Sequence, residues 1–297
     1  MNNCKIIILG ASGMLGHAVF HEMLVNRDFD VIGTVRSLSE VDTHFPGRML
    51  ERVVENVDAF RIDSLEKVIE EFTPDIVINC IGIIKQLPVS REAIPVITLN
   101  SLFPHQVASL CKEHDCRMIH VSTDCVFDGA KGSYTEDDKL TADDLYGISK
   151  YMGEVQYDHA ITIRTSIIGH ELSSNLSLVE WFLSQTGSVR GYTNAIYTGF
   201  PTVEIANIIA DYIIPDENLS GLYQVSSNPI SKYDLLKIVS EVYGKKIEIA
   251  PYADYYDNKS LISEKFRKKT GYQPPDWRVL IGKMHKNFKQ FGYLRNL

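Results

Sequence analysis

Apolar runs of four to six residues recur between stretches of helical character through the first half of the chain. They lie at residues 5–9, 30–35, 59–62, 76–80, 117–122 and 160–164. Short apolar runs that alternate with helices predict the buried strands of a parallel sheet. We therefore expect an α/β fold, a doubly wound Rossmann sheet with right-handed crossovers.

Beyond residue 166 this alternation gives way to segments rich in Ser, Gly and Asn, at 173–178 and 187–194. Between and after them, helices are expected at 179–183 and 202–212. Loops of this kind around a fixed core commonly form a substrate pocket.

The last third of the chain returns to regular elements. Residues 221–225 are expected to rejoin the main sheet as a strand, and Ser231 with Asp234 forms a capping-box pattern that opens a helix ending at Tyr243. We predict a dinucleotide-binding Rossmann domain and a smaller α/β substrate-binding domain in the carboxyl half. The predicted boundaries are residues 1–166 with 196–226 for the first domain and residues 167–195 with 227–297 for the second.

Three glycines follow the first expected strand at GxxGxxG spacing. Glycines there permit a tight turn and close approach of the backbone to a pyrophosphate, while the following helix offers unpaired N–H groups to the phosphates. The strand before and the helix after this loop favour a dinucleotide site over a plain turn. The expected cofactor contacts are Gly10, Ser12, Gly13, Met14, Leu15 and Gly16.

The second expected strand ends next to Arg36 and Ser37, where an NAD-binding protein usually carries an acid. Residues 34–37 contain none. Arg36 and Ser37 suit the 2′-phosphate of NADP, so NADPH is the preferred cofactor and NAD the alternative. In the competing interpretation, Arg36 is only a surface charge.

Two further segments complete the expected cofactor site. Asp63 and Ser64 follow the third expected strand as a helix cap, and Asp63 is a candidate for reaching the adenine. Cys80, Ile81 and Gly82 are small or apolar residues beyond the fourth strand, against which a nicotinamide would lie. Alternatively, they form a plain strand-ending turn.

Tyr146 and Lys150 stand four residues apart in an expected helix start, so their side chains should share one face. A neighbouring ammonium lowers the pKa of a phenol, which suits proton transfer in carbonyl reduction or alcohol oxidation. The chain has three Tyr-xxx-Lys pairs, but only this one follows a strand end that carries Ser122, Thr123 and Asp124. In a parallel sheet such an end faces the ligand crevice, although a turn rich in Ser, Thr and Asp is the alternative.

The remaining polar candidates have structural interpretations. Tyr233 with Lys237 is expected on an amphipathic helix, and Tyr255 with Lys259 in a loop rich in Tyr and Asp. Asn100 is a polar residue in a long helical stretch, residues 91–114. It is either a core amide that holds a backbone carbonyl or water, or a residue of the site.

Composition narrows the class of protein further. The 297 residues are 44% hydrophobic, enough for a sizeable core, and no secretory or membrane-spanning segment is recognised, so we expect a cytoplasmic protein. Five cysteines without a CxxC pair, and nine scattered histidines, suggest reduced thiols and no metal site. The net charge of −8 argues against a nucleic-acid surface, so the expected partner is a small molecule held locally.

With these residues in place, the sequence resembles the extended short-chain dehydrogenase/reductases, and within them the dTDP-4-dehydrorhamnose reductase family, over nearly its whole length. The resemblance rests on GASGMLG at 10–16, VSTDCVFDG at 121–129, GSYTE at 132–136, YGISK at 146–150 and IRTSIIG at 163–169. In the carboxyl half it rests on GLYQVSSNPISKYDLL and SLISEKFRKKTGYQPPDW.

The resemblance implies reduction by NADPH of the 4-keto group of a nucleotide-linked 6-deoxysugar, in deoxysugar or surface polysaccharide biosynthesis. The implied catalytic residues are Thr123, Tyr146 and Lys150, and the last two, with Val121, would also contact the cofactor. The implied substrate contacts are Ser122, Thr123, Asp124, Cys125, Phe127 and Lys85. Cys125 stands where the family usually has an aromatic residue, and the segment IGIIKQLP at 81–88 departs from the usual loop, so the sugar stays undefined.

Three other functions compete with this one. A dehydratase is disfavoured, because related dehydratases carry Asp-Glu directly after the threonine, and here Asp124 is followed by Cys125. A sugar-nucleotide epimerase of the same fold would retain bound NAD, which Arg36 disfavours. A non-catalytic NADP-binding regulatory subunit is the alternative from a different class. A homodimer is a further expectation from the family.

Overall fold

The computed structural model describes residues 4–27 and 29–291. Its contacts divide the chain into two compact units, each built from three segments. Unit 1 consists of Met1–Thr123, Asp143–Ile163 and Ala206–Leu222, and unit 2 of Asp124–Ala142, Arg164–Ile205 and Tyr223–Leu297. Grouping by contacts does not test which parts fold independently, so the domain boundaries given above stay a prediction.

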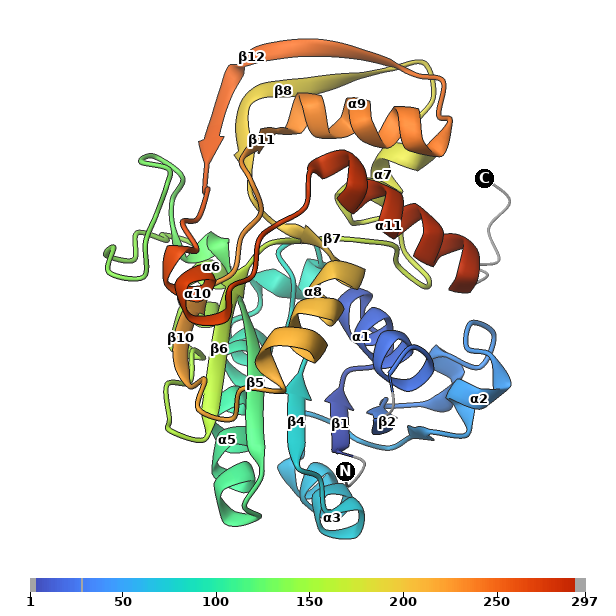
Figure 1. Cartoon of the computed structure of the whole chain (residues 1–297), viewed down its shortest axis with the longest axis vertical. Coiled ribbons are helices and arrows are strands. Elements are labelled where there is room, and N and C mark those ends of the chain that lie inside the picture. Colours follow the sequence, from blue (N-terminus) through green and yellow to red (C-terminus); the bar gives the residue numbers. More distant parts are fainter. Residues whose placement is uncertain (1–3, 28, 292–297) are drawn as a thin grey trace. The chain divides into compact units, whose positions relative to one another are not determined.

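The main sheet has seven strands in the order β10-β6-β5-β4-β1-β2-β3. Their bounds are β1 Lys5–Leu9, β2 Asp30–Thr34, β3 Val53–Val54, β4 Ile76–Asn79, β5 Arg117–Thr123, β6 Ala160–Thr165 and β10 Gly221–Gln224. The pairs β3–β2, β2–β1, β1–β4 and β4–β5 run parallel. Figure 1 shows β1 and β4 side by side with their arrowheads in the same direction. The predicted doubly wound sheet is confirmed.

One strand of this sheet was placed wrongly by the sequence pattern. The third strand is Val53–Val54, which pairs with Gly33 and Thr34, and residues 59–62 are not a strand. The Asp58 carboxylate accepts a hydrogen bond from the Phe60 backbone N–H at 3.0 Å, which turns the chain there. Phe60 is 52% exposed, so its hydrophobicity did not indicate burial.

Helices accompany the strands of the main sheet. Their bounds are α1 Met14–Val25, α2 Gly47–Leu50, α3 Ile62–Phe72, α4 Ala93–Ile97, α5 Phe103–Glu113, α6 Leu145–Met152 and α8 Thr202–Ile208. Shorter helical turns are η1 Leu38–Glu40 and η2 Pro88–Arg91, and π-helical turns are η3 Thr98–Leu102 and η5 Ile209–Ile213. The predicted helical stretches at 91–114 and 202–212 are therefore present, each with a π-helical turn.

The helix that carries Tyr146 is shorter than predicted. It ends at Met152 instead of continuing toward His159, and Gly153 is its C-cap. A Cβ at Gly153 would lie 2.0 Å from the Asn100 carbonyl oxygen, so only glycine allows this close packing on η3. Helix α6 therefore ends where the chain packs against η3.

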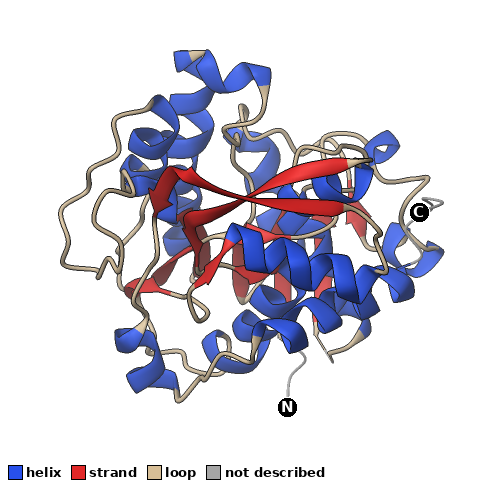
Figure 2. Cartoon of the chain, turned by 90° about the horizontal axis from the view of Figure 1, so that it is seen from above, coloured by secondary structure: helices blue, strands red, loops and turns tan. Residues whose placement is uncertain are grey.

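Unit 2 contains two small sheets, β11-β8-β12 and β7-β9. Their strands are β7 Ile167–Ile168, β8 Ser188–Tyr197, β9 Phe200–Pro201, β11 Ile230–Ser231 and β12 Glu248–Asn258. The long strands β8 and β12 run side by side in Figure 2. The predicted loops at 187–194 and around Tyr255 were wrong. Most residues of the edge strand β12 are exposed, so its sequence carries no apolar alternation.

Unit 2 also contains five helical elements among the described residues. They are η4 Asp124–Val126, α7 Leu178–Ser184, α9 Lys232–Tyr243, α10 Glu264–Thr270 and α11 Trp277–Phe291, of which α7 and α9 were predicted. The capping box of α9 is confirmed, because the Ser231 hydroxyl accepts from the Asp234 N–H at 3.0 Å. Among the described residues, none of the helices has the length and apolar character needed to cross a membrane.

Candidate active site

The glycine loop joins β1 to α1 and has the geometry of an anion-binding turn. Gly10 has φ +78°, and a Cβ at Gly16 would lie 2.0 Å from the Gly10 carbonyl oxygen. Gly13 is the N-cap of α1 and has no side chain to occupy the first N–H groups of the helix. The first turn of α1 carries no carboxylate. These features fit a pyrophosphate at the helix N-terminus.

The loop after β4 lies against this glycine loop. Strand β1 has β2 on one side and β4 on the other, which makes the β1–β4 edge the point where the strand order reverses. A Cβ at Gly10 would lie 2.8 Å from Ile81 Cγ1. Of the predicted contacts, Cys80 and Ile81 thus meet the glycine loop at the switch point, and Gly82 follows them in the same segment. Burial raises the pKa of the Cys80 thiol to about 12, which keeps it neutral.

Helix α6 presents Tyr146 and Lys150 one turn apart, as predicted. Its N-cap Asp144 accepts a hydrogen bond from the Gly147 N–H at 2.7 Å. The Lys150 Nζ donates to the carbonyl oxygen of Val121 on β5 at 2.8 Å, and Thr123 is the last residue of the same strand. The end of β5 and α6 therefore hold the three predicted catalytic residues on two adjacent elements.

Lys150 is almost fully buried, with 6% of its surface exposed. Burial lowers the pKa of its ammonium to about 8, although the negative charge of Glu154 acts in the opposite direction. The ammonium thus changes charge close to neutral pH. A group of this kind beside Tyr146 controls how readily the phenol gives up a proton.

Asn100 connects the π-helical turn η3 to the loop after β4. Its Oδ1 accepts from the Ile83 N–H at 2.8 Å, and its Nδ2 donates to the Ile83 carbonyl oxygen at 3.1 Å. The interpretation of Asn100 as a core amide that holds a backbone carbonyl is confirmed. A Cβ at Gly82 would lie 3.3 Å from Asn100 Oδ1 and 3.8 Å from Lys150 Nζ. Asn100 thereby fixes the segment that passes over Lys150.

Ser122 is buried, and its hydroxyl donates to Glu154 Oε1 at 2.8 Å. The side chain thus contacts the chain just beyond α6. Its predicted contact with substrate stays a prediction that this hydrogen bond does not support.

At the other end of the expected dinucleotide site, Arg36 and Ser37 follow β2 as predicted. The Ser37 side chain caps η1 by accepting from the Ser39 N–H at 3.4 Å. The Arg36 Nε donates to Glu40 Oε1 at 3.0 Å, and the Ser12 hydroxyl of the glycine loop donates to Glu40 Oε2 at 2.6 Å. Glu40 therefore holds a carboxylate between the residues that follow β2 and the glycine loop.

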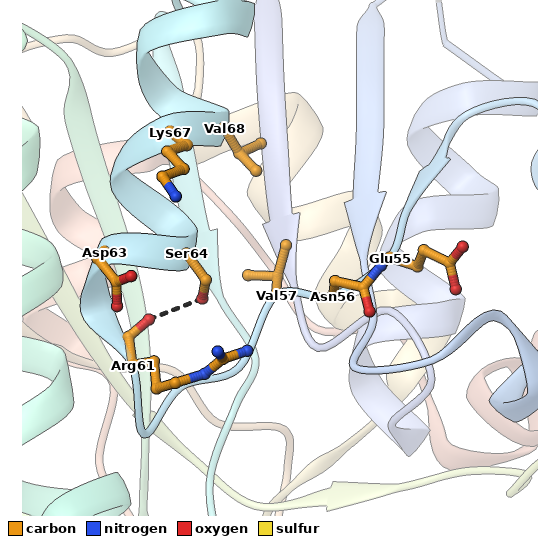
Figure 3. Close-up of a pocket in the computed structure, with 8 residues that line it drawn as sticks. All are labelled: Glu55, Asn56, Val57, Arg61, Asp63, Ser64, Lys67 and Val68. Atoms are coloured by element: carbon orange, nitrogen blue, oxygen red, sulfur yellow. Dashed lines mark hydrogen bonds between the residues drawn. The ribbon is translucent and has the colours of Figure 1, made fainter.

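Asp63 and Ser64 line a pocket of about 290 Å³, which Figure 3 shows. The other lining residues are Glu55, Asn56, Val57, Arg61, Lys67 and Val68. The prediction that Asp63 and Ser64 cap the helix was wrong, because α3 already begins at Ile62 with Arg61 as its N-cap. Instead, the Ser64 hydroxyl donates to the Arg61 carbonyl oxygen at 2.7 Å and accepts from the Asp58 N–H.

The predicted substrate residues have different environments. Asp124 begins η4 and is buried, and Cys125 is half-buried. The Phe127 ring is 1% exposed and stacks on Tyr134 with 4.0 Å between centroids, so it belongs to the core of unit 2. Lys85 is exposed and forms an ion pair with Asp144 at 2.5 Å.

A metal was not expected, and in the part of the chain that the structure describes one group of potential ligands occurs away from these residues. Glu66 and Glu70 of α3 and His114 place three potential ligand atoms within 4.8 Å of one another. Exposed acidic groups commonly gather in this way without an ion. We assign them no role.

The sequence model of the family described as RmlD substrate binding domain matches residues 4–290. The chain belongs to this family. The dTDP-4-dehydrorhamnose reductase of Aggregatibacter actinomycetemcomitans is 28% identical over 314 residues, covering 97% of this chain and 99% of that protein. Methionine adenosyltransferase 2 subunit beta of Danio rerio is 25% identical over 253 residues, covering 80% and 74%. The predicted family resemblance is thus confirmed.

A solved structure supports the fold of this RmlD-family member. The dTDP-4-dehydrorhamnose reductase of Bacillus anthracis, crystallised in complex with NADP, superposes with a TM-score of 0.79. The superposition covers 96% of this chain and 99% of that one at 20% identity. At this identity the similarity shows the fold alone.

Three residues that lie at the candidate site of this RmlD-family member were not predicted as site residues from the sequence. Glu40 stands four residues after Arg36 and Glu154 four residues after Lys150, a spacing that places side chains next to each other on a helical turn. Asn100 was noticed but left between two interpretations. The four-residue spacing could have indicated that Glu40 lies near Arg36 and Glu154 near Lys150.

Proposed function

We propose that this protein uses NADPH to reduce the 4-keto group of a nucleotide-linked 6-deoxysugar, as a reductase of the dTDP-4-dehydrorhamnose reductase type. Its product would serve deoxysugar or surface polysaccharide synthesis. Family membership and the similarity to the reductase from Aggregatibacter actinomycetemcomitans support this reaction. The cofactor preference rests on Arg36 and Ser37 after β2, and the cytoplasmic location stays a prediction.

One observation carries the proposal. The Lys150 ammonium donates a hydrogen bond to the Val121 carbonyl oxygen of β5, and Thr123 lies two residues after Val121 on the same strand. On α6, Tyr146 lies one turn before Lys150. The loop of Gly82 passes beside the same ammonium, and it adjoins the glycine loop through Ile81. These contacts support a site in which a hydroxyl, a phenol and a cation would meet at the nicotinamide position, the arrangement that carbonyl reduction needs.

In the proposed reaction, bound NADPH supplies the hydride to the carbonyl carbon. Tyr146 donates its phenolic proton to the carbonyl oxygen, so that the alkoxide does not accumulate. The Thr123 hydroxyl donates a hydrogen bond to the same oxygen as negative charge develops on it. Lys150 stabilises the phenolate that Tyr146 becomes, and it is suited to binding the nicotinamide ribose. Cys80 is neutral and contributes an apolar wall.

The proposal is tested by following NADPH absorbance with a panel of nucleotide-linked 4-keto-6-deoxysugars. We expect turnover by the unmodified protein and a loss of at least about a thousandfold in Tyr146→Phe, since general acid catalysis and phenol orientation are both removed. Tyr151→Phe is the matched control, because Tyr151 lies on the same helix and is 44% exposed. It should retain full activity. The best substrate of the panel would identify the sugar.

Two results would redirect the assignment. Tightly bound NAD after purification, with interconversion of sugar epimers and no net NADPH consumption, would identify an epimerase. NADPH binding without reduction of any panel member would favour a regulatory subunit, the class suggested by the name of the Danio rerio relative. In that case, Tyr146→Phe and Tyr151→Phe would behave alike.

The proposal includes a homodimer. Large apolar side chains are exposed on α4, η3 and α6 of unit 1, namely Ile94, Ile97, Leu102, Ile148, Tyr151 and Met152. An exposed apolar group of this kind is typical of an association surface. Sedimentation velocity should give a dimer that Ile148→Lys weakens, whereas Val279→Lys, at the exposed Val279 of α11, should leave it intact.

A further inference from the structure

Glu40 links two parts of the expected cofactor site that are distant in sequence. One carboxylate oxygen accepts from the Ser12 hydroxyl at 2.6 Å, and the other accepts from the Arg36 guanidinium at 2.9 to 3.0 Å. Ser12 belongs to the glycine loop, and Arg36 follows β2. The turn η1 carries Glu40 back toward both, because the Ser37 carbonyl accepts from the Glu40 N–H at 3.1 Å.

The exposure of the partners shows which of them is fixed. The Arg36 side chain is 73% exposed and that of Glu40 only 23%. Glu40 is thus held against the protein between Ser12 and η1, while Arg36 reaches it from solvent. A ligand can draw the arginine away, but the carboxylate stays beside the glycine loop.

This carboxylate stands at the position where the two forms of the dinucleotide differ. Arg36 and Ser37 suit a 2′-phosphate, whereas a carboxylate accepts hydrogen bonds from the ribose hydroxyls of the form without that phosphate. A carboxylate also repels a phosphate dianion a few ångströms away, and it keeps Arg36 engaged. The two residues therefore act in opposite directions on the choice of cofactor.

We propose that Glu40 determines cofactor selectivity by opposing Arg36, so that its charge narrows the difference in affinity between NADPH and NADH. This inference rests on the proposed function, because it assumes that the glycine loop binds a dinucleotide. Glu40 competes with the 2′-phosphate for Arg36 and offers an acceptor to the 2′-hydroxyl of NADH. A purely structural tie between η1 and the glycine loop would make no such distinction.

The experiment compares the dissociation constants of NADPH and NADH, measured by calorimetry, in the unmodified protein and in Glu40→Gln. The glutamine keeps an oxygen for the Ser12 hydrogen bond but removes the charge. We expect NADPH to bind about tenfold more tightly and NADH somewhat more weakly. Arg36→Gln should have the opposite effect, with a large loss of NADPH affinity and little change for NADH.

Glu70→Gln is the matched control, since Glu70 is exposed near the end of α3 and the change of charge is the same. It should change neither constant. Equal effects of Glu40→Gln on both cofactors, or none on either, would overturn the inference and leave the proposed function standing. If the unmodified, folded protein binds neither cofactor, the proposed function fails along with it. Circular dichroism of each variant checks that the fold is intact.

Discussion

The hydroxyl of Ser122 donates a 2.8 Å hydrogen bond to the carboxylate of Glu154, and both side chains are buried. Glu154 stands four residues beyond Lys150, just after the end of α6. The bond joins the end of β5, where Thr123 lies, to the segment that follows α6. A buried carboxylate close to a buried ammonium also acts on its charge, which leads to the first prediction.

Glu154→Gln should shift the pH dependence of reduction toward acid. The pKa of Lys150 is about 8, and Glu154 raises it above the value that burial alone would give. In the proposed mechanism reduction requires the charged ammonium, so activity should fall as pH rises through about 8 in the unmodified protein. Without the negative charge of Glu154, the same fall should begin at lower pH. Rate measurements between pH 6 and 9.5, on the kcat of the best substrate, would check this.

The control for this shift is Ser122→Ala, which removes the hydrogen bond but keeps the charge. It leaves a buried carboxylate oxygen without its hydroxyl donor and should cost about 1–3 kcal/mol of unfolding free energy. The fall of kcat at high pH should stay close to that of the unmodified protein. If Glu154→Gln and Ser122→Ala shift the pH at which kcat falls by equal amounts, Glu154 acts by its position and not by its charge.

The stability of the protein should also respond to the titration of Lys150. Its folded pKa of about 8 lies below the ordinary 10.5 that it regains on unfolding. The unfolded state therefore binds more protons between these values, and the Lys150 contribution to stability rises as pH increases from about 8 to 10.5. Lys150→Met should remove this part of the pH dependence in denaturant titrations. An unchanged pH dependence would contradict the shifted pKa.

Gly16→Ala should abolish tight cofactor binding. The added Cβ would lie 2.0 Å from the Gly10 carbonyl oxygen, so the loop must move away from α1. Such overpacking costs about 1–3 kcal/mol and displaces the N–H groups expected at the pyrophosphate. Gly47→Ala is the matched control, because nothing lies within 4 Å of its added Cβ. NADPH titration of both folded variants should separate them, and equal affinities would argue against this loop as the phosphate site.

The sequence pattern predicted the strands that are buried on both faces of the sheet and the turns that require glycine. Strands β1, β4 and β6 are almost entirely buried and mainly apolar in sequence, and Gly16 is required by contact with Gly10. Strand β12 was missed because it is an exposed edge strand, and β3 because it has only two residues. In these elements pairing with a neighbour, and not hydrophobicity, decides the structure.

The candidate site shows the same division between local and long-range determinants. Tyr146 with Lys150, and the glycine loop, are local patterns and were predicted. The bonds of Asn100 to Ile83 and of Glu40 to Ser12 join residues 17 and 28 positions apart, so that no local spacing indicates them. They depend on the packing of η3 and η1, which the sequence does not specify by any short motif.

Asn100→Ala should loosen the loop after β4. The substitution leaves the N–H and the carbonyl of Ile83 without their side-chain partner inside the protein, at a cost of about 2–4 kcal/mol. Because this loop borders Lys150, cofactor affinity should fall together with stability. Asn194→Ala is the control, since its exposed side chain bonds one carbonyl oxygen, that of Ala253, and should change stability by less than about 1 kcal/mol. Urea unfolding and NADPH titration of both variants measure the two effects.

Asp144 contributes both to a helix cap and to an ion pair. It caps α6 through the Gly147 N–H at 2.7 Å and pairs with the exposed Lys85 at 2.5 Å. Loss of an N-cap carboxylate costs about 1 kcal/mol, whereas an exposed ion pair contributes between about 0 and 1 kcal/mol. Asp144→Ala should therefore destabilise the protein measurably and reduce kcat, because α6 positions Tyr146. Asp143→Ala, at the exposed neighbouring position, should do neither.

Lys85→Ala separates the ion pair from the substrate contact predicted for Lys85. If Lys85 only pairs with Asp144, its removal leaves kcat and KM close to those of the unmodified protein and lowers stability by less than about 1 kcal/mol. If it also binds an anionic part of the substrate, KM rises about tenfold or more, with the same small loss of stability. We expect the second result, because the lysine is 60% exposed at its side chain and can leave Asp144 to meet a phosphate without loss of the helix cap. An unchanged KM would exclude Lys85 from the substrate site.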